Sequence, residues 1–189
     1  MLRFPLFVCF WLVACGTTTS DTLRVRPTNW AQPVLGKGVA NWFVVSPDVH
    51  RCAQPSRAGM RQLAAFGIQS VVNLREYHSD VDEVEGTPLA LNELPLDAGD
   101  LTYAQLVDAL RAVVQAKKPV VVHCWRGADR TGAVVAAWRV AIDGLTPSEA
   151  CDEMVAGGFG HSAFYGNLRT LVTGLDPASL RRDVGLPPL

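Results

Sequence analysis

The sequence predicts an α/β fold in which a central, mostly parallel sheet is flanked by helices on both faces. Short β-branched runs at 68–74 and 120–123 have the composition of buried strands. Segments 101–116 and 131–142 show helical periodicity or strong helical composition. Strands and helices alternate along the chain, which is the order typical of this fold class.

The remaining elements follow in the same alternating pattern, with no internal repeat. Ser56 is the expected N-cap of the first helix, and Gly67 is its expected stop. The acidic segment 76–87 gives no clear element, and a loosely ordered, Pro-rich tail is expected from Gly174. Strands are predicted at 41–45, 49–52, 68–74, 89–94 and 120–123, and helices at 56–65, 101–116, 131–142, 147–155 and 162–172.

The composition indicates one folded domain. A chain of 189 residues with 49% hydrophobic and 19% charged residues can bury a sizeable core and is not disordered. The net charge is -1, and the pI is near 6.4, so no basic field favours nucleic acid as a partner. An anionic substrate would have to be attracted by a local positive site.

The amino terminus resembles a bacterial lipoprotein signal. After the positive start at Arg3, residues 4–14 form an apolar run of about eleven residues, too short to span a bilayer as a helix. Leu12-Val13-Ala14-Cys15 resembles a lipobox, in which Cys15 would carry the lipid. An ordinary secretory signal or a buried amino-terminal helix is the alternative. Gly16 after the cysteine favours the outer membrane, with the folded domain on the periplasmic side.

These signals divide the chain into four parts. A signal peptide at 1–14 is followed by a tether at 15–40, rich in Thr, Pro and Gly. The folded domain is expected at 41–175 and the tail at 176–189. Membrane attachment is expected through the lipid anchor alone.

Three cysteines are left for the folded domain. Cys52, Cys124 and Cys151 are an odd number for an exported protein, and their spacing fits neither a disulfide framework nor a zinc site. One functional thiol is the simplest interpretation, and no metal or cofactor is expected. Cys52 is interpreted as a small buried hydrophobic residue; the alternative is a reversible disulfide with Cys124.

The motif that carries chemistry runs from Cys124 to Gly132. Cys124 and Arg130 are separated by five residues, which lie between a central-type strand and a helix. Backbone N–H groups of such a loop and the helix amino terminus can bind an oxyanion together. Arg130 offers a planar fork for two phosphate oxygens. The positive surroundings favour the thiolate, which is the nucleophilic form of Cys124.

Each loop residue has an expected part in this site. Gly127 lets the loop bend, and Thr131 can donate a hydrogen bond to the Cys124 sulfur as the sulfur is displaced. His123 is expected to order the loop through the backbone and is not the base. The alternative to a catalytic role is a buried structural cysteine beside a solvated arginine. The residues expected to bind phosphate are Trp125, Arg126, Gly127, Ala128, Asp129 and Arg130.

On these residues the chain resembles the protein tyrosine phosphatase superfamily, and within it the compact dual-specificity-like branch. The resemblance covers roughly 41–172 and extends to Arg51-Cys52-Ala53-Gln54-Pro55, to Val71-Val72-Asn73-Leu74-Arg75 and to the glycines at 157–160. It implies phosphomonoester hydrolysis through a phosphocysteine intermediate. Cys52 stands where the family usually has Ser. Trp125 is unusually bulky for its position, and it either narrows the mouth of the site or stacks on a substrate ring.

The resemblance also implies a general acid on a separate loop. Asp97 and Asp100 are the candidates, and Asp100 is preferred because it lies just before a helix, where the family's acid usually falls. Either aspartate is also an ordinary cap or turn residue. Asp129 is a third possibility, but it is expected to order the loop or to meet a substrate hydroxyl.

The substrate is not determined by the sequence. A phosphorylated protein, a phosphoinositide and a soluble inositol phosphate all fit a phosphatase site. Two other functions stay open: a phosphate-recognition module without turnover, and sulfur transfer of the rhodanese kind, which also uses a loop cysteine.

Overall fold

A computed structural model describes residues 26–36 and 38–188 of the chain. The predicted signal peptide at 1–14 and the lipidation site Cys15 lie outside the described residues. Among the residues that are described, no helix is both long and apolar enough to cross a lipid bilayer.

A six-stranded mixed sheet forms the centre of the fold, with the order β1-β2-β3-β6-β4-β5. The β1–β2 and β2–β3 pairs are antiparallel, and the β3–β6, β6–β4 and β4–β5 pairs are parallel. This confirms the predicted fold class, a mostly parallel sheet between helices. The strands are β1 Gln32–Pro33, β2 Phe43–Ser46, β3 Val49–Cys52, β4 Ser70–Arg75, β5 Ala90–Leu96 and β6 Val120–His123.

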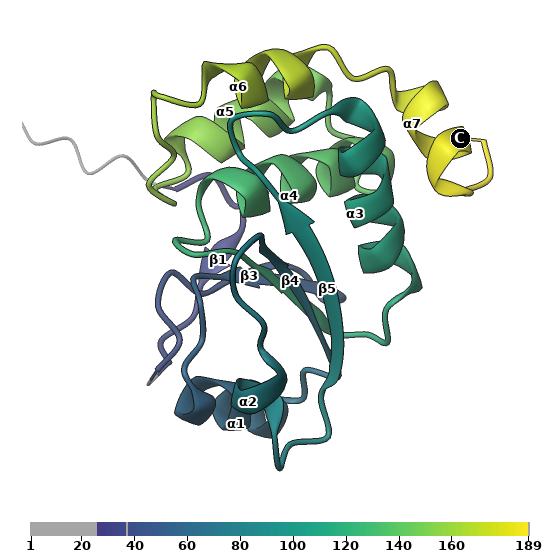
Figure 1. The fold of residues 1–189 in the computed structure, drawn as a ribbon. Helices are drawn as coiled ribbons and strands as arrows, with labels where there is room; N and C mark the ends of the chain where they lie inside the picture. Colours follow the sequence, from purple (N-terminus) through teal and green to yellow (C-terminus); the bar gives the residue numbers. More distant parts are fainter. Residues whose placement is uncertain (1–25, 37, 189) are drawn as a thin grey trace, which may run out of the picture.

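Helices cover both faces of the sheet, as Figure 1 shows: α1 and α2 lie on one side, and the larger group α3–α7 lies on the other. Successive residues of β6 pack against opposite helical layers. Val120 and Val122 belong to the core under α3–α7, whereas Val121 packs with Met60 and Leu63 of α1. The helices are α1 Arg57–Phe66, α2 Val81–Val84, α3 Tyr103–Gln115, α4 Asp129–Ala141, α5 Pro147–Ala156, α6 Gly166–Thr173 and α7 Pro177–Val184.

Local sequence signals set the ends of several helices. The Ser56 side chain accepts a hydrogen bond from Gly59 N, and Gly67 ends α1 in the left-handed conformation, as predicted. Thr102 and Thr146 each form a capping box at the start of α3 and α5.

Two predictions about the ends of the domain were wrong. The tail is not loosely ordered, because Pro177–Val184 form α7, which contacts α3 and α4. Asp176 caps this helix by accepting from Ser179 N, and Gly185 ends it. The segment expected to be a tether also reaches the sheet: Gln32–Pro33 form β1, and the adjacent Ala31 is fully buried.

The fold places one loop at the centre of the sheet edge where parallel strands end. β6 lies between β3 and β4, and its carboxyl end leads into α4 through the loop that begins at Cys124. Ligands of open α/β sheets bind at this edge.

Candidate active site

The loop between β6 and α4 carries the nucleophile candidate. Cys124 follows the last residue of β6 and is 2% exposed, at the bottom of a surface hollow. α4 begins at Asp129 and has no side-chain N-cap, so its first N–H groups are not covered by the protein's own cap.

The carbonyl groups of the loop accept hydrogen bonds from residues outside the loop. Gln54 N donates to Trp125 O at 3.1 Å. Asn41 Nδ2 donates to Arg126 O at 2.9 Å. The carbonyl of the next residue, Gly127, accepts from Arg51 Nη2 at 2.8 Å.

The N–H groups of the same loop are free of protein partners. Within the part of the chain that the structure describes, the backbone N–H groups of Trp125 through Ala128 donate to no protein acceptor. Because the carbonyls are engaged elsewhere, these donors and the start of α4 are available to bind an oxyanion. The unpaired N–H groups are those expected to bind phosphate, and phosphate binding by them stays a prediction.

Arg51 is the main support of this loop. It is completely buried, and its guanidinium lies 3.6 Å from the centroid of the Phe159 ring. Burial lowers the pKa of Arg51 to about 10, while Glu153 and Cys124 act in the opposite direction. The side chain therefore stays charged at neutral pH and holds Gly127 O with a charge-assisted hydrogen bond.

Gly127 is required where the loop touches β3. Its φ is +66°, and a Cβ at this position would lie 2.3 Å from the carbonyl oxygen of Cys52. Both conditions demand glycine, because side chains rarely adopt this conformation and backbone cannot move aside.

Arg130 shares the hollow with Cys124. Its Nη1 donates to Leu96 O at 3.0 Å, whereas the buried Nε has no partner among the described residues. The hollow, which we call the main hollow, has a volume of about 360 Å³. It is lined by Ala98, Cys124, Trp125, Arg126, Asp129, Arg130, Ser162, Phe164 and Tyr165.

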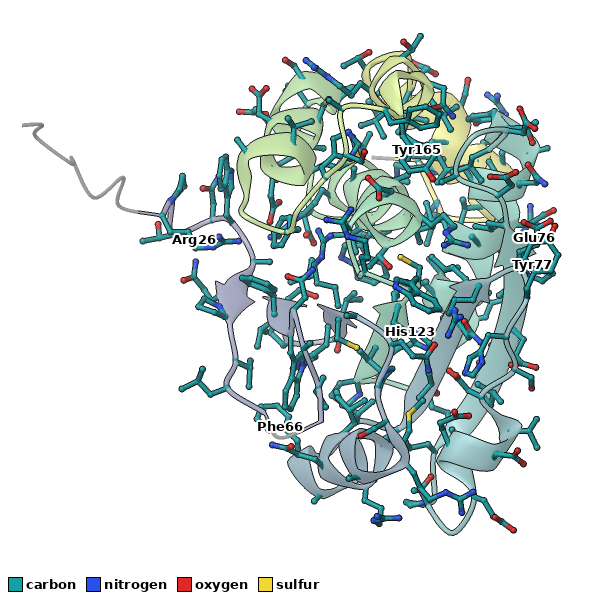
Figure 2. All side chains as sticks on the ribbon, turned by 60° about the vertical axis from the view of Figure 1, so that its left-hand side comes forward. Arg26, Phe66, Glu76, Tyr77, His123 and Tyr165 are labelled. Atoms are coloured by element: carbon teal, nitrogen blue, oxygen red, sulfur yellow. The ribbon has the colours of Figure 1, made fainter. Side chains whose placement is uncertain are left out.

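His123 is fully buried beneath the loop. Its Nε2 lies 2.6 Å from Asp80 Oδ2, and its Nδ1 lies 3.4 Å from Cys124 O. Figure 2 shows His123 in the interior of the molecule. These contacts agree with a role in ordering the loop, as predicted from the sequence.

Thr131 does not make the contact that the sequence predicts. Its hydroxyl is buried and has no hydrogen-bond partner within the described residues. Donation to the Cys124 sulfur is not formed in this structure and stays a prediction for the displaced sulfur.

Asp129 ties the loop to the opposite wall of the main hollow. Its Oδ1 accepts from Ser162 N at 2.8 Å and lies 3.1 Å from His161 Nδ1. Burial lowers the pKa of His161, partly offset by Asp129, so the imidazole is neutral at physiological pH. Asp129 thus orders the walls of the site, in agreement with one of its two expected roles.

The two candidate acids occupy different parts of one loop. Asp97 follows Leu96, whose carbonyl accepts from Arg130, and Asp97 Oδ1 accepts from Gly99 N at 2.8 Å. Asp100 is exposed and has no hydrogen bond among the described residues. Asn167 Nδ2 donates to the carbonyls of Ala98 and Gly99 and fixes the loop between them.

One side-chain cluster has the composition of a metal site. Ligand atoms of His78, Asp80 and Glu83 lie within 4.8 Å of one another. His78 Nε2 is 3.3 Å from Asp80 Oδ1 and 3.4 Å from Glu83 Oε1. Asp80 is already engaged by His123 and Gln54, so we interpret the cluster as ion pairs.

The chain matches a known family over more than half of its length. The family described as DSP-PTPase phosphatase fused to NAD+ kinase matches residues 36–164. The chain belongs to this family. This match and the similarity to the dual specificity protein phosphatase TpbA confirm the predicted enzyme class, a cysteine-dependent phosphatase.

Two curated proteins illustrate the relationship. The dual specificity protein phosphatase TpbA of Pseudomonas aeruginosa is 29% identical over 164 residues, covering 86% of this chain and 74% of TpbA. The probable chloroplastic NAD kinase 2 of Oryza sativa is 31% identical over 124 residues, covering 53% of this chain but 13% of the rice protein.

Solved structures show the same fold. The crystal structure of P. aeruginosa TpbA superposes with a TM-score of 0.76 at 28% identity and covers 85% of this chain and 99% of that one; TpbA was also solved in complex with pTyr. The catalytic core of the PP-IP phosphatase SIW14 from S. cerevisiae gives a TM-score of 0.67 at 18% identity, covering 79% and 93%. The second similarity concerns the fold alone.

Sequence reasoning missed the residues that hold the loop from outside. Arg51 and Gln54 were recognised as parts of a family motif, but their contacts with the loop were not predicted, and Asn41 was not singled out. The positive φ of Asn41, 51°, is a backbone feature that Asn tolerates better than most residues, and this residue type before a strand was the available signal.

Proposed function

We propose that this protein hydrolyses phosphomonoesters through a phosphocysteine on Cys124. The proposal is carried by one observation: residues outside the loop bind its carbonyl groups, and its N–H groups have no protein acceptor among the described residues, beside a hollow that Cys124 and Arg130 line together. Such fixed donors stabilise the charge of the transferring phosphoryl group.

The reaction has two steps. The Cys124 thiolate attacks phosphorus, the bond from phosphorus to the leaving oxygen breaks, and a carboxylic acid protonates that oxygen. The resulting carboxylate then takes a proton from water, whose oxygen attacks phosphorus. The S–P bond breaks, orthophosphate leaves and the thiolate is restored.

We assign the proton transfers to Asp97 in place of the aspartate preferred from the sequence, Asp100. Asp97 directly follows the residue whose carbonyl contacts the Arg130 guanidinium, and it directly precedes Ala98, which lines the main hollow. Within the described part of the chain, Asp100 has no comparable contact with the residues expected to bind phosphate.

Aryl phosphates, and phosphotyrosine in proteins in particular, fit the main hollow best. Three aromatic side chains, Trp125, Phe164 and Tyr165, line it together with Cys124. Trp125 is 60% exposed and Phe164 is 86% exposed, so both rings are available to a substrate. The TpbA complex with pTyr supports this choice.

The experiment is an aryl phosphatase assay in the presence of a chelator. Wild type should hydrolyse p-nitrophenyl phosphate and phosphotyrosine, and Cys124→Ser should be inactive. Asp97→Asn should lose about 10²- to 10⁴-fold in kcat on phenyl phosphate, whose leaving group needs the proton, and much less on p-nitrophenyl phosphate. If Asp100→Asn loses kcat in this pattern and Asp97→Asn keeps a kcat close to that of wild type, Asp100 is the general acid.

Two other outcomes would change the proposed function itself. No turnover by folded wild type would overturn the proposal and favour a phosphate-recognition module. Thiosulfate-dependent sulfur transfer would favour the rhodanese alternative.

We also propose that the domain is anchored to the bacterial envelope by a lipid on Cys15, with the active site on the periplasmic side. The lipobox-like sequence supports this proposal. Wild type expressed in a bacterium should fractionate with membranes and incorporate a labelled fatty acid. Cys15→Ala should lose the label. A labelled Cys15→Ala protein, or an unlabelled wild type, would contradict the anchor.

A further inference from the structure

A second hollow adjoins the main hollow on the other side of Trp125 and Arg130. It has a volume of about 290 Å³ and is lined by Arg75, Glu76, Tyr77, Trp125 and Arg130. Two of these residues, Trp125 and Arg130, also line the main hollow. A substrate bound at Cys124 can therefore extend into this second hollow, which we call the side hollow.

Arg75 is fixed in position at the side hollow. Its guanidinium lies 4.4 Å from the centroid of the Trp125 ring, and its Nη1 donates to Gln54 Oε1 at 2.9 Å. Gln54 Nε2 in turn donates to the buried Asp80 at 2.7 Å. A guanidinium held on two sides loses little further freedom when it binds a ligand.

The positive charge at the side hollow is not neutralised by an ion pair. Within residues 26–36 and 38–188, neither Arg75 nor Arg130 has a carboxylate within 4.0 Å. Burial lowers the pKa of Arg75, and the charge of Arg130 lowers it further, although Asp80 acts against both. Two guanidinium groups that repel each other across one hollow are stabilised by an anion between them.

Glu76 is the one acidic residue among those that line this hollow. Interaction with Glu76 raises the pKa of the exposed Tyr77, so the carboxylate lies close to that phenol. Figure 2 shows Glu76 and Tyr77 together at the outer edge of the molecule. The glutamate therefore lies at the rim, beside Tyr77.

We propose that the side hollow is a second anion subsite, which binds a carboxylate or phosphate carried by the same substrate whose scissile phosphate lies on the Cys124 loop. The preferred substrates are then phosphomonoesters with a second anionic group near the first. This inference rests on the proposed phosphatase function and specifies the substrate class of that site.

The test compares pairs of substrates that differ in one charge. The first pair is 3-carboxyphenyl phosphate and 3-carbamoylphenyl phosphate. The second is a phosphotyrosyl peptide with Glu next to phosphotyrosine and the same peptide with Gln there. In wild type, kcat/KM should be about five- to tenfold higher for the charged member of at least one pair, the size expected for one charge-assisted contact at the surface.

Arg75→Gln should bring that ratio to about one. Comparing ratios removes the effect of leaving-group chemistry, which is the same in both proteins. Arg75→Lys should keep part of the preference, and Arg57→Gln, at an exposed arginine of α1 paired with Glu85, should keep all of it. The pair that shows the preference identifies the source of the anion, as a ring substituent or as a neighbouring acidic side chain. Ratios in both pairs that are the same in wild type and Arg75→Gln would overturn the subsite.

A binding measurement separates this inference from the proposed function. Calorimetry with inorganic pyrophosphate and orthophosphate should show tighter binding of pyrophosphate to wild type and equal binding to folded Arg75→Gln. If wild type binds in this way without hydrolysing aryl phosphates, the phosphatase proposal fails and the anion subsite stands. If wild type hydrolyses phenyl phosphate but shows no difference between the two ligands and no charge preference, the subsite fails alone.

Discussion

His123 Nε2 lies 2.6 Å from Asp80 Oδ2, and both side chains are fully buried behind the catalytic loop. Asp80 also accepts from Gln54, the residue whose backbone N–H holds Trp125 O. The pair therefore connects the bottom of the Cys124 loop with the network that positions Arg75 at the side hollow.

Replacing Asp80 with Asn should destabilise the protein at neutral pH. Burial acts to raise the pKa of Asp80, but hydrogen bonds and charge from His123, Gln54 and His78 outweigh it, so the pKa is lowered. The folded protein therefore binds the proton less readily than the unfolded chain. The stabilisation is complete above the unfolded pKa of about 4 and is lost as the pH falls through the folded value.

Urea unfolding should show this dependence. At pH 7, Asp80→Asn should lower the free energy of unfolding by about 3–5 kcal/mol, the usual cost of breaking a buried pair, and the difference from wild type should shrink below about pH 4. Asp108→Asn, at an exposed pair with Arg111, should change it by less than about 0.5 kcal/mol. A difference for Asp80→Asn that grows as the pH falls would contradict the assigned direction of the pKa shift.

Gly127→Ala should damage both stability and activity. The added Cβ meets backbone atoms of Cys52 at 2.3 and 2.4 Å, and the residue has a positive φ. We expect a loss of about 2–5 kcal/mol from strain and overpacking together, and kcat on aryl phosphates should fall at least about a hundredfold, because the phosphate-binding amides move.

Gly86→Ala is the matched control for this substitution. Gly86 also has a positive φ, +75°, but nothing lies within 4 Å of its added Cβ. It should show only the conformational cost of about 1–2 kcal/mol and normal kcat. Equal effects of the two substitutions would mean that the contact between Gly127 and Cys52 is unimportant.

The sequence was sufficient for the chemistry that is local in the chain. Cys124 and Arg130 are six positions apart, so a strand, a loop and a helix bring them to one hollow, and the strand at 120–123 was evident from its valines. The contacts that shape the loop come from distant residues: 76 positions separate Arg51 from Gly127, and 85 separate Asn41 from Arg126. No periodicity or spacing in a single sequence reports such contacts.

Other errors have local causes. The last helix was missed because its prolines were read as a sign of disorder, although Asp176 before Pro177 and the later Gly185 are the start and stop signals of a helix. β1 consists of two residues that pair with β2, too short for an alternating pattern to reveal. The general acid stays a prediction, because Asp97 and Asp100 lie three positions apart on one loop and spacing alone does not choose between them.

Arg26 should act as a positioning residue for the far wall of the main hollow. It donates to Gly157 O at 2.6 Å, and its guanidinium lies 5.1 Å from the Phe159 ring. Figure 2 shows it where the described part of the chain begins. These contacts hold the start of the loop that brings Phe164 and Tyr165 to the hollow.

Arg26→Met should therefore raise KM for phosphotyrosine about three- to tenfold, equivalent to roughly 1 kcal/mol of binding, while kcat changes less than about twofold. Arg61→Met, at an exposed position of α1 on the other side of the sheet, should leave both constants unchanged. A lower melting temperature with an unchanged KM would show that Arg26 only stabilises the fold.

Alkylation should distinguish Cys124 from the other two cysteines of the domain. Burial, with Cys124 and Asp80 nearby, raises the pKa of Cys52 well above its usual value, and burial also raises the pKa of Cys151. Both thiols are thus protonated and buried at pH 7, whereas Cys124 opens onto the main hollow. Iodoacetamide should label the Cys124 peptide in the native protein, phosphate should protect it, and the other two peptides should need denaturant.

Peroxide treatment tests whether Cys52 forms a disulfide with Cys124. Because protonated Cys52 is a poor nucleophile, Cys52→Ser and wild type should recover the same phosphatase activity when peroxide treatment is followed by reductant. Recovery that is several-fold lower in Cys52→Ser, with a linked Cys52–Cys124 peptide in wild type, would instead establish the disulfide.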